Sequence, residues 1–381
     1  MNNLEKIKNV LNFYVISNNL KNIILDEENN YSIADNIFGS MILATAINSE
    51  LKETKNLAKI YRMLFLYEYI NLDENNEILN LNLKKQYIKE IMEARDLKTK
   101  NGRLIFKYKM LDFLLTNTIK EKEENQTELI KEGSTIIATL CDSKPQKCEE
   151  IFKFYYLNTR LKDKVRTGWD KNHWNVSSDR VETVSEHVVG TFGLALALSS
   201  EFGYKFDVDK MMTMIPIHET GETIIGDITP FDGITPEQKK KLEHLAMQDA
   251  LGKLEKRKKL LSLLYEFDDQ KTPEAKCAHY CDKIEADLQS KIYQEKGLHH
   301  SLDDQENNCV FKSSKVQKML ENGAKDVFDI WYEWDKKIYE NDLEFPEFMN
   351  ILKIARLHEL LHLDDLELSD ESKLAKLIKI K

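Results

Sequence analysis

The chain has 381 residues, 42% of them hydrophobic, and a formal net charge of −10. This length allows one large domain or two of ordinary size, and the acidic charge argues against an extended contact with nucleic acid, which needs a basic face. No apolar run approaches the roughly 18 to 20 residues that span a bilayer, so we expect a cytoplasmic protein without a membrane span.

The composition also favours one class of secondary structure. With only 13 Gly and 6 Pro, and few stretches in which apolar and polar residues alternate, the sequence predicts an all-α protein. Its five cysteines, an odd number without metal-site spacing, indicate reduced thiols. Cys277 and Cys281 lie one helical turn apart, which fits half a metal site but is more typical of buried small residues.

Several stretches of the first half of the chain recur in the second half. Residues 32–39 (SIADNIFG) resemble residues 183–190 (TVSEHVVG), and the same offset of 151 residues, without a gap, aligns 59–68 with 210–219. At an offset of 141 residues, Phe13, Tyr14, Leu20 and Lys21 match Phe154, Tyr155, Leu161 and Lys162. Chance similarity between two amphipathic regions is the alternative.

The shared offset favours a tandem of two related helical halves, 1–130 and 150–300, followed by a helical C-terminal extension over 301–381. Such halves would pack as a pseudo-symmetric pair, in place of the two-fold dimer of a single-copy chain. The stretch 127–147, which contains glycine and proline, is the predicted boundary. A weaker match pairs Asp112 with Asp282.

Potential metal ligands gather in the second half. His187 lies in the apolar helical stretch 184–198, where an isolated histidine is more often a core residue than a ligand. His218 and Glu219 follow the apolar run 211–217. Neighbouring helical residues diverge by about 100°, so both side chains reach one ion only if it lies off the helix axis.

Further acids follow these histidines. Glu222 lies four residues after His218, and hence on the same helix face. Asp227 follows in a loop, and Asp282 interrupts the helical segment 273–295. Acidic residues are rarely buried unless they are paired or bound to a metal. A mixed set of histidine nitrogens and carboxylate oxygens suits Mn, Fe, Co, Ni or Zn better than a structural thiolate zinc.

The second half contains five motifs in a fixed order: RTGW at 166–169, RVETVSEH at 180–187, HETGE at 218–222 leading to GDITP at 226–230, TPEAK at 272–276 and DKIE at 282–285. In these motifs the sequence resembles the HD superfamily of metal-dependent phosphohydrolases, and most closely its 5′-deoxynucleotidase branch. The resemblance directly covers about a third of the chain. It implies an HD-domain bundle of α-helices with the site in a cleft between them.

The resemblance also implies a role for each site residue. One divalent transition metal, Mn, Co, Fe, Ni or Zn in preference to Mg, would be held by His187, His218, Glu219 and Asp282. The catalytic acids would be Glu222 and Asp227. Arg166 would bind the phosphate, and Trp169 would lie near the sugar.

The sequence departs from the family's pattern at one ligand. The family's His-Asp pair is His218-Glu219 here. The extra methylene places the carboxylate about 1.5 Å further from the backbone, whereas metal–oxygen bonds tolerate only a few tenths of an ångström. Coordination by Glu219 would therefore need a different rotamer, a shifted helix or a bidentate mode.

The first half departs much further. The repeat alignment leaves Glu68 opposite Glu219, but it replaces an arginine, two histidines and a glutamate of the second half by Leu25, Asn36, Tyr67 and Asn71. We therefore expect a degenerate N-terminal half that holds no metal and has a structural or regulatory role.

The resemblance implies the hydrolysis of nucleoside or deoxynucleoside 5′-monophosphates to nucleoside and phosphate. Two alternatives remain open: an HD hydrolase of nucleoside triphosphates, cyclic nucleotides or guanosine polyphosphates, and a nucleotide- or metal-sensing pseudoenzyme. The expected partner is a small nucleotide, and oligomerisation beyond the pseudo-symmetric pair is left open.

Two patterns outside the motifs are expected to be structural. The aromatic stretch 327–334 predicts an amphipathic helix for core or interface packing rather than base stacking. The lysine-rich stretches 239–241 and 256–259 predict solvated helix faces.

Overall fold

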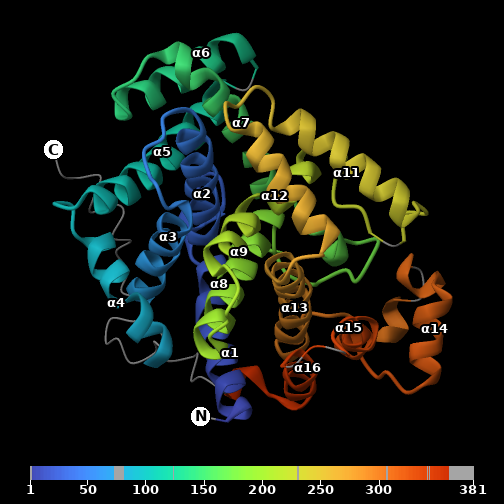
Figure 1. The fold of residues 1–381 in the computed structure, drawn as a ribbon. Helices are drawn as coiled ribbons and strands as arrows, with labels where there is room; N and C mark the ends of the chain where they lie inside the picture. Colours follow the sequence, from blue (N-terminus) through green and yellow to red (C-terminus); the bar gives the residue numbers. More distant parts are fainter. Residues whose placement is uncertain are drawn as a thin grey trace.

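The computed structural model describes residues 2–72, 81–122, 124–229, 231–305, 308–340, 342 and 344–359. This part of the chain is almost wholly helical (Figure 1), which confirms the predicted all-α class. Its sheet is a two-stranded antiparallel hairpin of β1 (Ile24–Asp26) and β2 (Tyr31–Ser32). Within the described ranges, no helix is long and apolar enough to cross a membrane.

The first half of the chain forms α1 (Asn3–Asn18), α2 (Ile33–Glu50), α3 (Leu57–Leu72), α4 (Leu81–Arg95), α5 (Lys100–Lys122) and α6 (Gln126–Leu140). Helix α6 occupies most of the predicted boundary, so only 141–144 connect it to α7 (Pro145–Asp163). Gly133 is a packing residue here, not a turn residue. A Cβ atom on it would overlap the Phe152 ring, so the glycine lets α6 and α7 approach closely.

The second half continues with α8 (Val184–Phe202), α9 (Val208–Met214), α10 (Glu222–Ile225), α11 (Pro236–Ala250), α12 (Arg257–Asp269) and α13 (Pro273–Glu295). Two 3₁₀ segments, η2 (Thr167–Trp169) and η3 (Ile215–Gly221), lie between these helices. The C-terminal extension forms α14 (Ser314–Glu321), α15 (Val327–Asp335) and α16 (Phe345–Ile354). The rest of the predicted extension, 360–381, lies outside the described residues.

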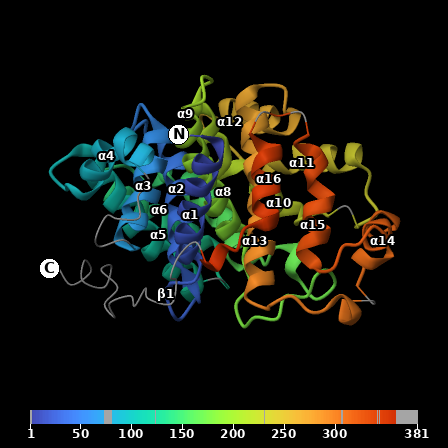
Figure 2. The same ribbon diagram turned by 90° about the horizontal axis from the view of Figure 1, so that it is seen from below.

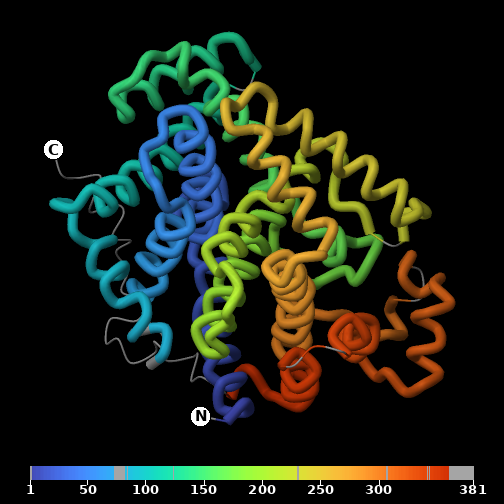
Figure 3. The backbone as a smooth tube through the Cα atoms, viewed as in Figure 1, coloured from blue at the N-terminus to red at the C-terminus, as the bar shows by residue number. Residues whose placement is uncertain are grey.

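Helices α2 and α8 form the centre of the molecule. Helix α8 is buried from Val184 to Glu201, and α2 is buried along most of its length, as expected for helices that are apolar on all sides. Helix α8 contacts α1, α2 and α13, and Figure 2 shows these four helices side by side. The trace in Figure 3 places the helices of the first half on one side of α8 and α11 to α16 on the other.

Both central helices begin with the same kind of cap. Ser32 and Asp35 form a capping box at α2, and Thr183 and Glu186 form one at α8. In each box the hydroxyl accepts a hydrogen bond from the N3 backbone N–H, and the carboxylate accepts one from the N-cap N–H. The local sequence therefore fixes the start of both helices, and it places His187 in the first turns of α8.

Candidate metal centre

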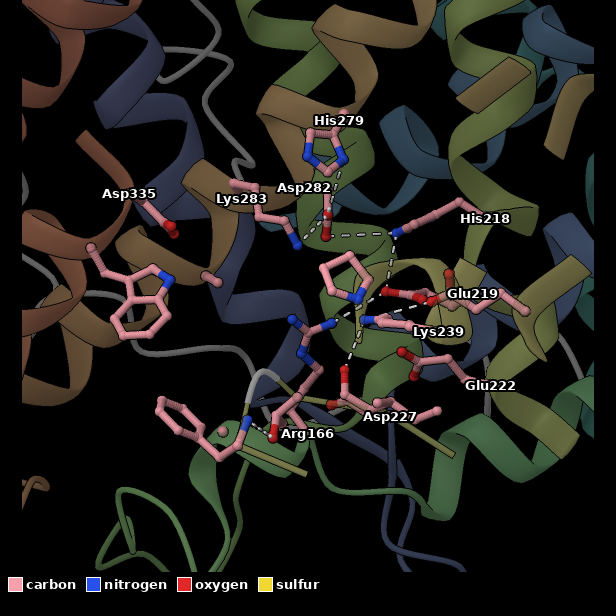
Figure 4. A pocket seen from close by; sticks show the side chains of 18 of the residues that line it. Arg166, His218, Glu219, Glu222, Asp227, Lys239, His279, Asp282, Lys283 and Asp335 are labelled. Atoms are coloured by element: carbon pink, nitrogen blue, oxygen red, sulfur yellow. Dashed lines mark hydrogen bonds and ion pairs between the residues drawn. The ribbon is translucent and has the colours of Figure 1, made fainter. Parts of the chain in front are cut away.

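Three elements bring the four predicted ligands together. His187 comes from α8, His218 and Glu219 come from η3, and Asp282 comes from α13. One ligand atom from each residue lies within 4.8 Å of those of the other three. Figure 4 shows His218, Glu219 and Asp282 pointing toward one another at the wall of a pocket. Each predicted ligand therefore lies close to the other three, and His187 is not an isolated core histidine.

Hydrogen bonds from the Nδ1 atoms orient both imidazole rings so that Nε2 faces the cluster. Nδ1 of His218 lies 2.6 Å from the carbonyl oxygen of Ile215, so this nitrogen carries the proton and donates. Nδ1 of His187 donates to Glu285 in the same way. With Nδ1 held as the donor, loss of the other proton would leave the electron pair of each ring on Nε2, which is the tautomer that a metal ligand requires.

The Nε2 atom of His218 provides a direct test of whether a cation fits. It is buried and has no hydrogen-bond partner in the part of the chain that the structure describes. It lies 3.2 Å from Oε1 of Glu219 and 3.8 Å from Oδ1 of Asp282. Nε2 of His187 lies 2.8 Å from the same Asp282 oxygen. A buried acceptor without a donor, beside two carboxylates, fits a bound cation.

The charges of the cluster favour the same conclusion. Burial opposes protonation of His218, but Glu219 and Asp282 outweigh it and raise the pKa of this imidazole to about 10. Burial would raise the pKa of the Asp282 carboxyl, yet Lys283 and His187 hold it well below its usual range. Both carboxylates are therefore ionised, and a divalent cation would displace protons from the histidines.

Glu219 reaches the cluster from a segment that is not α-helical. Residues Ile215–Gly221 form a 3₁₀ helix with a proline at its start, where the sequence predicted a regular helix. Oε1 of Glu219 lies 3.8 Å from Nε2 of His187 and 3.3 Å from Nη1 of Arg166. The longer side chain of Glu219 thus lies on a 3₁₀ turn, which winds more tightly than an α-helix.

The two predicted catalytic acids lie beside the cluster in contrasting surroundings. Burial raises the pKa of Glu222 well above its usual range, and Glu219 and Asp227 raise it further. Its Oε2 atom is buried without a hydrogen-bond partner among the described residues. Burial would also raise the pKa of Asp227, but Arg166 and a 2.9 Å hydrogen bond from the Thr167 N–H lower it. These opposite shifts favour the protonated form of Glu222 and the ionised form of Asp227.

Arg166 and Trp169 come from the loop that precedes α8. Arg166 is the N-cap of η2, and its guanidinium lies between Glu219 and Asp227 (Figure 4). Trp169 lines the same pocket, but its Nε1 donates to Glu182 at 2.8 Å. Trp169 is buried and its ring packs on that of Trp331, with the two ring centres 4.9 Å apart.

The pocket in front of the cluster has a volume of about 580 Å³, which suits a small-molecule ligand. Every predicted site residue except His187 lines this pocket. Its lining also includes aromatic side chains, among them Trp169, Trp174, Phe231, Trp331 and Trp334. Nε1 of Trp331 is buried and finds no acceptor within the described ranges.

Sequence reasoning missed several of these lining residues. Trp331 and Trp334 belong to α15, whose remaining aromatic residues pack as predicted, while these two face the pocket. Lys239 and Lys240 were expected on a solvated helix face, yet both line the pocket. The signal for α15 was its four aromatic residues within seven positions, 328–334, but only tertiary packing shows which of them face inward.

The first half has a lysine, Lys109, at the place that corresponds to the cluster of predicted ligands in the second half. Lys109 forms a buried ion pair with Glu68, and its Nζ atom lies 4.4 Å from the centre of the Tyr67 ring. Asn36 donates to Asp112 at 2.7 Å. Across the described residues, both clusters with metal-ligand geometry belong to the second half, and one of them, Glu182, His187 and Glu285, already surrounds the Lys21 ammonium.

Comparison with known proteins identifies the class of this fold and site. The family model of the HD domain matches residues 158–337, a range that includes every predicted site residue and α15. The chain is 35% identical over 149 residues to the 5′-deoxynucleotidase HDDC2 of Dictyostelium discoideum, which covers 37% of this chain and 76% of that protein. The chain belongs to the HD-domain family.

Further similarities narrow the class. The chain is 31% identical over 147 residues to the 5′-deoxynucleotidase HDDC2 of Homo sapiens, covering 38% of this chain and 69% of that one. These relatives place it on the 5′-deoxynucleotidase-like branch of the family, as the sequence predicted. The solved structure of the PH0347 protein from Pyrococcus horikoshii OT3 aligns with 55% of this chain and 99% of its own, at 21% identity and a TM-score of 0.38.

Proposed function

We propose that this protein is a metal-dependent phosphohydrolase that converts nucleoside or deoxynucleoside 5′-monophosphates to nucleoside and inorganic phosphate. The observation that carries the proposal is the buried Nε2 atom of His218, which has no hydrogen-bond partner among the described residues and belongs to a four-residue cluster with metal-ligand geometry. Two acids with opposite pKa shifts lie beside it. The relatives of the HD family that share this region are 5′-deoxynucleotidases.

One divalent cation fits the donor set, and His187, His218, Glu219 and Asp282 would hold it. Nitrogen and carboxylate ligands suit Mn, Co, Fe, Ni or Zn better than Mg. When bound, such a cation lowers the pKa of water and takes up charge from phosphate oxygens.

The chain's own residues would supply the remaining chemistry. Arg166, a planar cation at the cluster, would bind two phosphate oxygens and align the ester for attack. The ionised Asp227 would hold the attacking water and accept its proton. The protonated Glu222 would donate its proton to the leaving 5′-oxygen. The opposite pKa shifts of the two acids support this division of roles.

The aromatic side chains that line the pocket support a nucleotide as the substrate. A nucleobase needs a flat apolar surface, and Trp331 and Trp334 of α15 line the pocket beside Phe231. The indole N–H of Trp331 lacks an acceptor in the described structure and would donate to a base or sugar oxygen. Trp169, which packs on Trp331, would hold that ring in place near the sugar.

We also propose that the N-terminal half acts as a built-in second subunit. Ser32 donates to Glu186 at 2.7 Å, and Thr183 donates to Asp35 at 3.4 Å, so the two matched caps exchange equivalent contacts. Likewise α1 packs on α8 while α7 packs on α2. Reciprocal contacts of this kind are the property of a two-fold pair.

A cytoplasmic location, consistent with five free cysteines, stays a prediction.

The proposal is tested by phosphate release from ribo- and deoxyribonucleoside mono-, di- and triphosphates. Metal-stripped protein is assayed with Mn²⁺, Co²⁺ or Mg²⁺ added back. We expect release from monophosphates, strongest with Mn²⁺ or Co²⁺ and lost in His187→Ala. Asp227→Asn and Glu222→Gln should lower kcat by about 10² to 10⁴ while the metal stays bound, because general acid–base catalysis contributes that much.

Two results would contradict the proposal. Release from triphosphates alone would assign the pocket to a different HD hydrolase. No release with any metal, from protein that binds metal, would indicate a nucleotide-sensing pseudoenzyme.

A further inference from the structure

Glu285 links the proposed metal centre to the N-terminal half. It lies one turn after Asp282 on α13 and is fully buried. One of its carboxylate oxygens accepts the Nδ1 hydrogen bond of His187. The other accepts a 2.6 Å hydrogen bond from the Tyr14 hydroxyl and a 2.5 Å hydrogen bond from Lys21 Nζ. Both donors belong to the first half of the chain, from α1 and the turn that follows it.

Lys21 reaches a second part of the site through Glu182. The buried Lys21 ammonium forms an ion pair with Glu182 as well as with Glu285. Glu182 in turn accepts a hydrogen bond from Trp169 Nε1 at 2.8 Å, and its carbonyl oxygen accepts one from the Arg166 N–H at 3.1 Å. A single lysine from the first half therefore connects His187 with the loop that carries Arg166 and Trp169.

The second half leaves space for this connection. A Cβ atom on Gly190 would overlap the Glu285 carboxylate and would lie 2.9 Å from Lys21 Nζ. Any larger residue at this position of α8 would push the lysine away from the glutamate. Gly190 lies one helical turn after His187, and its lack of a side chain allows Lys21 to reach Glu285 beside that histidine.

The same arrangement recurs around Asp112 with the two halves exchanged, and no cluster of described residues there has metal-ligand geometry. Tyr155 and Lys162 of the second half donate to Asp112 of the first at 2.8 and 2.7 Å, and Asn36 donates to the other oxygen of Asp112. Gly39 gives the space. These contacts match Asp112 to Glu285, and they correct the weaker sequence match of Asp112 to Asp282.

We propose that Tyr14 and Lys21 are positioning residues of the metal centre, through which the N-terminal half fixes Glu285 and hence the ring of His187. The inference rests on the proposed function, since it assigns His187 to a metal. Glu285 without its two donors would be a buried charge paired only with a neutral imidazole, and burial of an unpaired charge is costly. The carboxylate would then shift toward other partners, and His187 would lose its fixed tautomer and orientation.

The recurrence provides a matched control for every substitution. Tyr14→Phe removes one buried hydroxyl that donates to Glu285, and Tyr155→Phe removes one that donates to Asp112. Affinity for Mn²⁺ is measured on the full chain by titration calorimetry. We expect Tyr14→Phe to weaken binding about 10-fold, as is typical for a partner that orients a metal-bound histidine, and Tyr155→Phe to change it less than twofold.

A second pair of variants and a second signal guard against a folding defect. Lys21→Met should weaken Mn²⁺ binding more than Tyr14→Phe, and Lys162→Met should not. In Co²⁺-loaded protein the visible spectrum should change in Tyr14→Phe and Lys21→Met alone. In assays with saturating metal, kcat should fall in these two variants while KM changes less than twofold.

The inference is overturned if Tyr14→Phe and Lys21→Met bind Mn²⁺ as tightly as their controls and leave the Co²⁺ spectrum unchanged. That failure is distinct from failure of the proposed function. If the inference fails, the variants bind Mn²⁺ normally while the unaltered protein still hydrolyses monophosphates. If the proposed function fails, the unaltered protein itself hydrolyses no monophosphate.

Discussion

Glu222 and Asp227 illustrate how neighbouring carboxyl groups acquire opposite protonation states. They are five residues apart in the chain, and burial acts on both in the same direction. Arg166 and the Thr167 N–H reverse the effect for Asp227, whereas Glu222 faces two further carboxylates. The sequence named both residues but could not divide the roles between them, because the division depends on where Arg166 lies.

Glu219 raises a separate question, because the His-Asp motif that the sequence resembles has an aspartate at this position. In this structure the glutamate combines with a 3₁₀ turn to place Oε1 beside the two histidines. Glu219→Asp would withdraw the carboxylate by about 1.5 Å, which is more than metal–oxygen bonds tolerate. We therefore expect this substitution to weaken Mn²⁺ binding about 10-fold, as measured by calorimetry.

The control for this prediction is Glu243→Asp. Glu243 also lines the pocket but is outside the ligand set, so its shortening should leave Mn²⁺ affinity unchanged. Equal or tighter binding by Glu219→Asp would show that the backbone of η3 adjusts to the shorter side chain.

At the scale of the elements, the caps of α2 and α8 do more than start two helices. Each cap satisfies its own backbone N–H groups and also contacts the cap of the other helix. Arg180 reinforces this contact by pairing with both Asp35 and Glu186. The starts of the two central helices are therefore tied to each other, and so are the positions of His187 and of the first half.

Ser32→Ala should lower the free energy of unfolding by about 2 kcal/mol. Loss of an N-cap costs about 1 kcal/mol, and loss of the hydrogen bond to Glu186 adds about 1 kcal/mol. Urea denaturation monitored by circular dichroism measures the difference. Thr235→Ala is the matched control, because Thr235 forms an exposed capping box at α11, so only the cap contribution should be lost. Equal losses in both variants would contradict a contribution from the contact between helices.

At the scale of the whole molecule, the two halves treat equivalent positions differently. The second half brings four predicted ligands within 4.8 Å of one another, whereas Lys109 of the first half forms an ion pair with Glu68. Because Lys109 already lies against the Glu68 carboxylate, this half needs no external cation there. The chain is therefore expected to bind one metal, not two.

Calorimetric titration of metal-stripped protein with Mn²⁺ should give one equivalent per chain. At a free concentration of 100 times Kd, bound Mn²⁺ should stabilise the fold by about 2.7 kcal/mol, which thermal denaturation detects as a higher Tm. His187→Ala should lose both the binding and the stabilisation. A second equivalent that persists in His187→Ala would assign a metal to the first half and contradict its degenerate state.

The sequence by itself determined the features that depend on neighbouring residues. The capping boxes at Ser32 and Thr183, the apolar helices that follow them, and the all-α class come from local hydrogen bonds and residue periodicity. The ordered motifs around His187, His218 and Asp282 were sufficient to predict the family. Their proposed roles as ligands stay predictions, although the structure brings them together.

Tertiary structure alone decided which distant groups meet. Tyr14 and Glu285 are separated by 271 positions, and no local pattern relates them. Trp331 faces the pocket while Tyr332 of the same helix is buried, because α13 covers one side of α15 and leaves the other open to the site. Local sequence fixes where helices begin and which faces are apolar, but the orientation in which those faces pack is set by side chains from the whole chain.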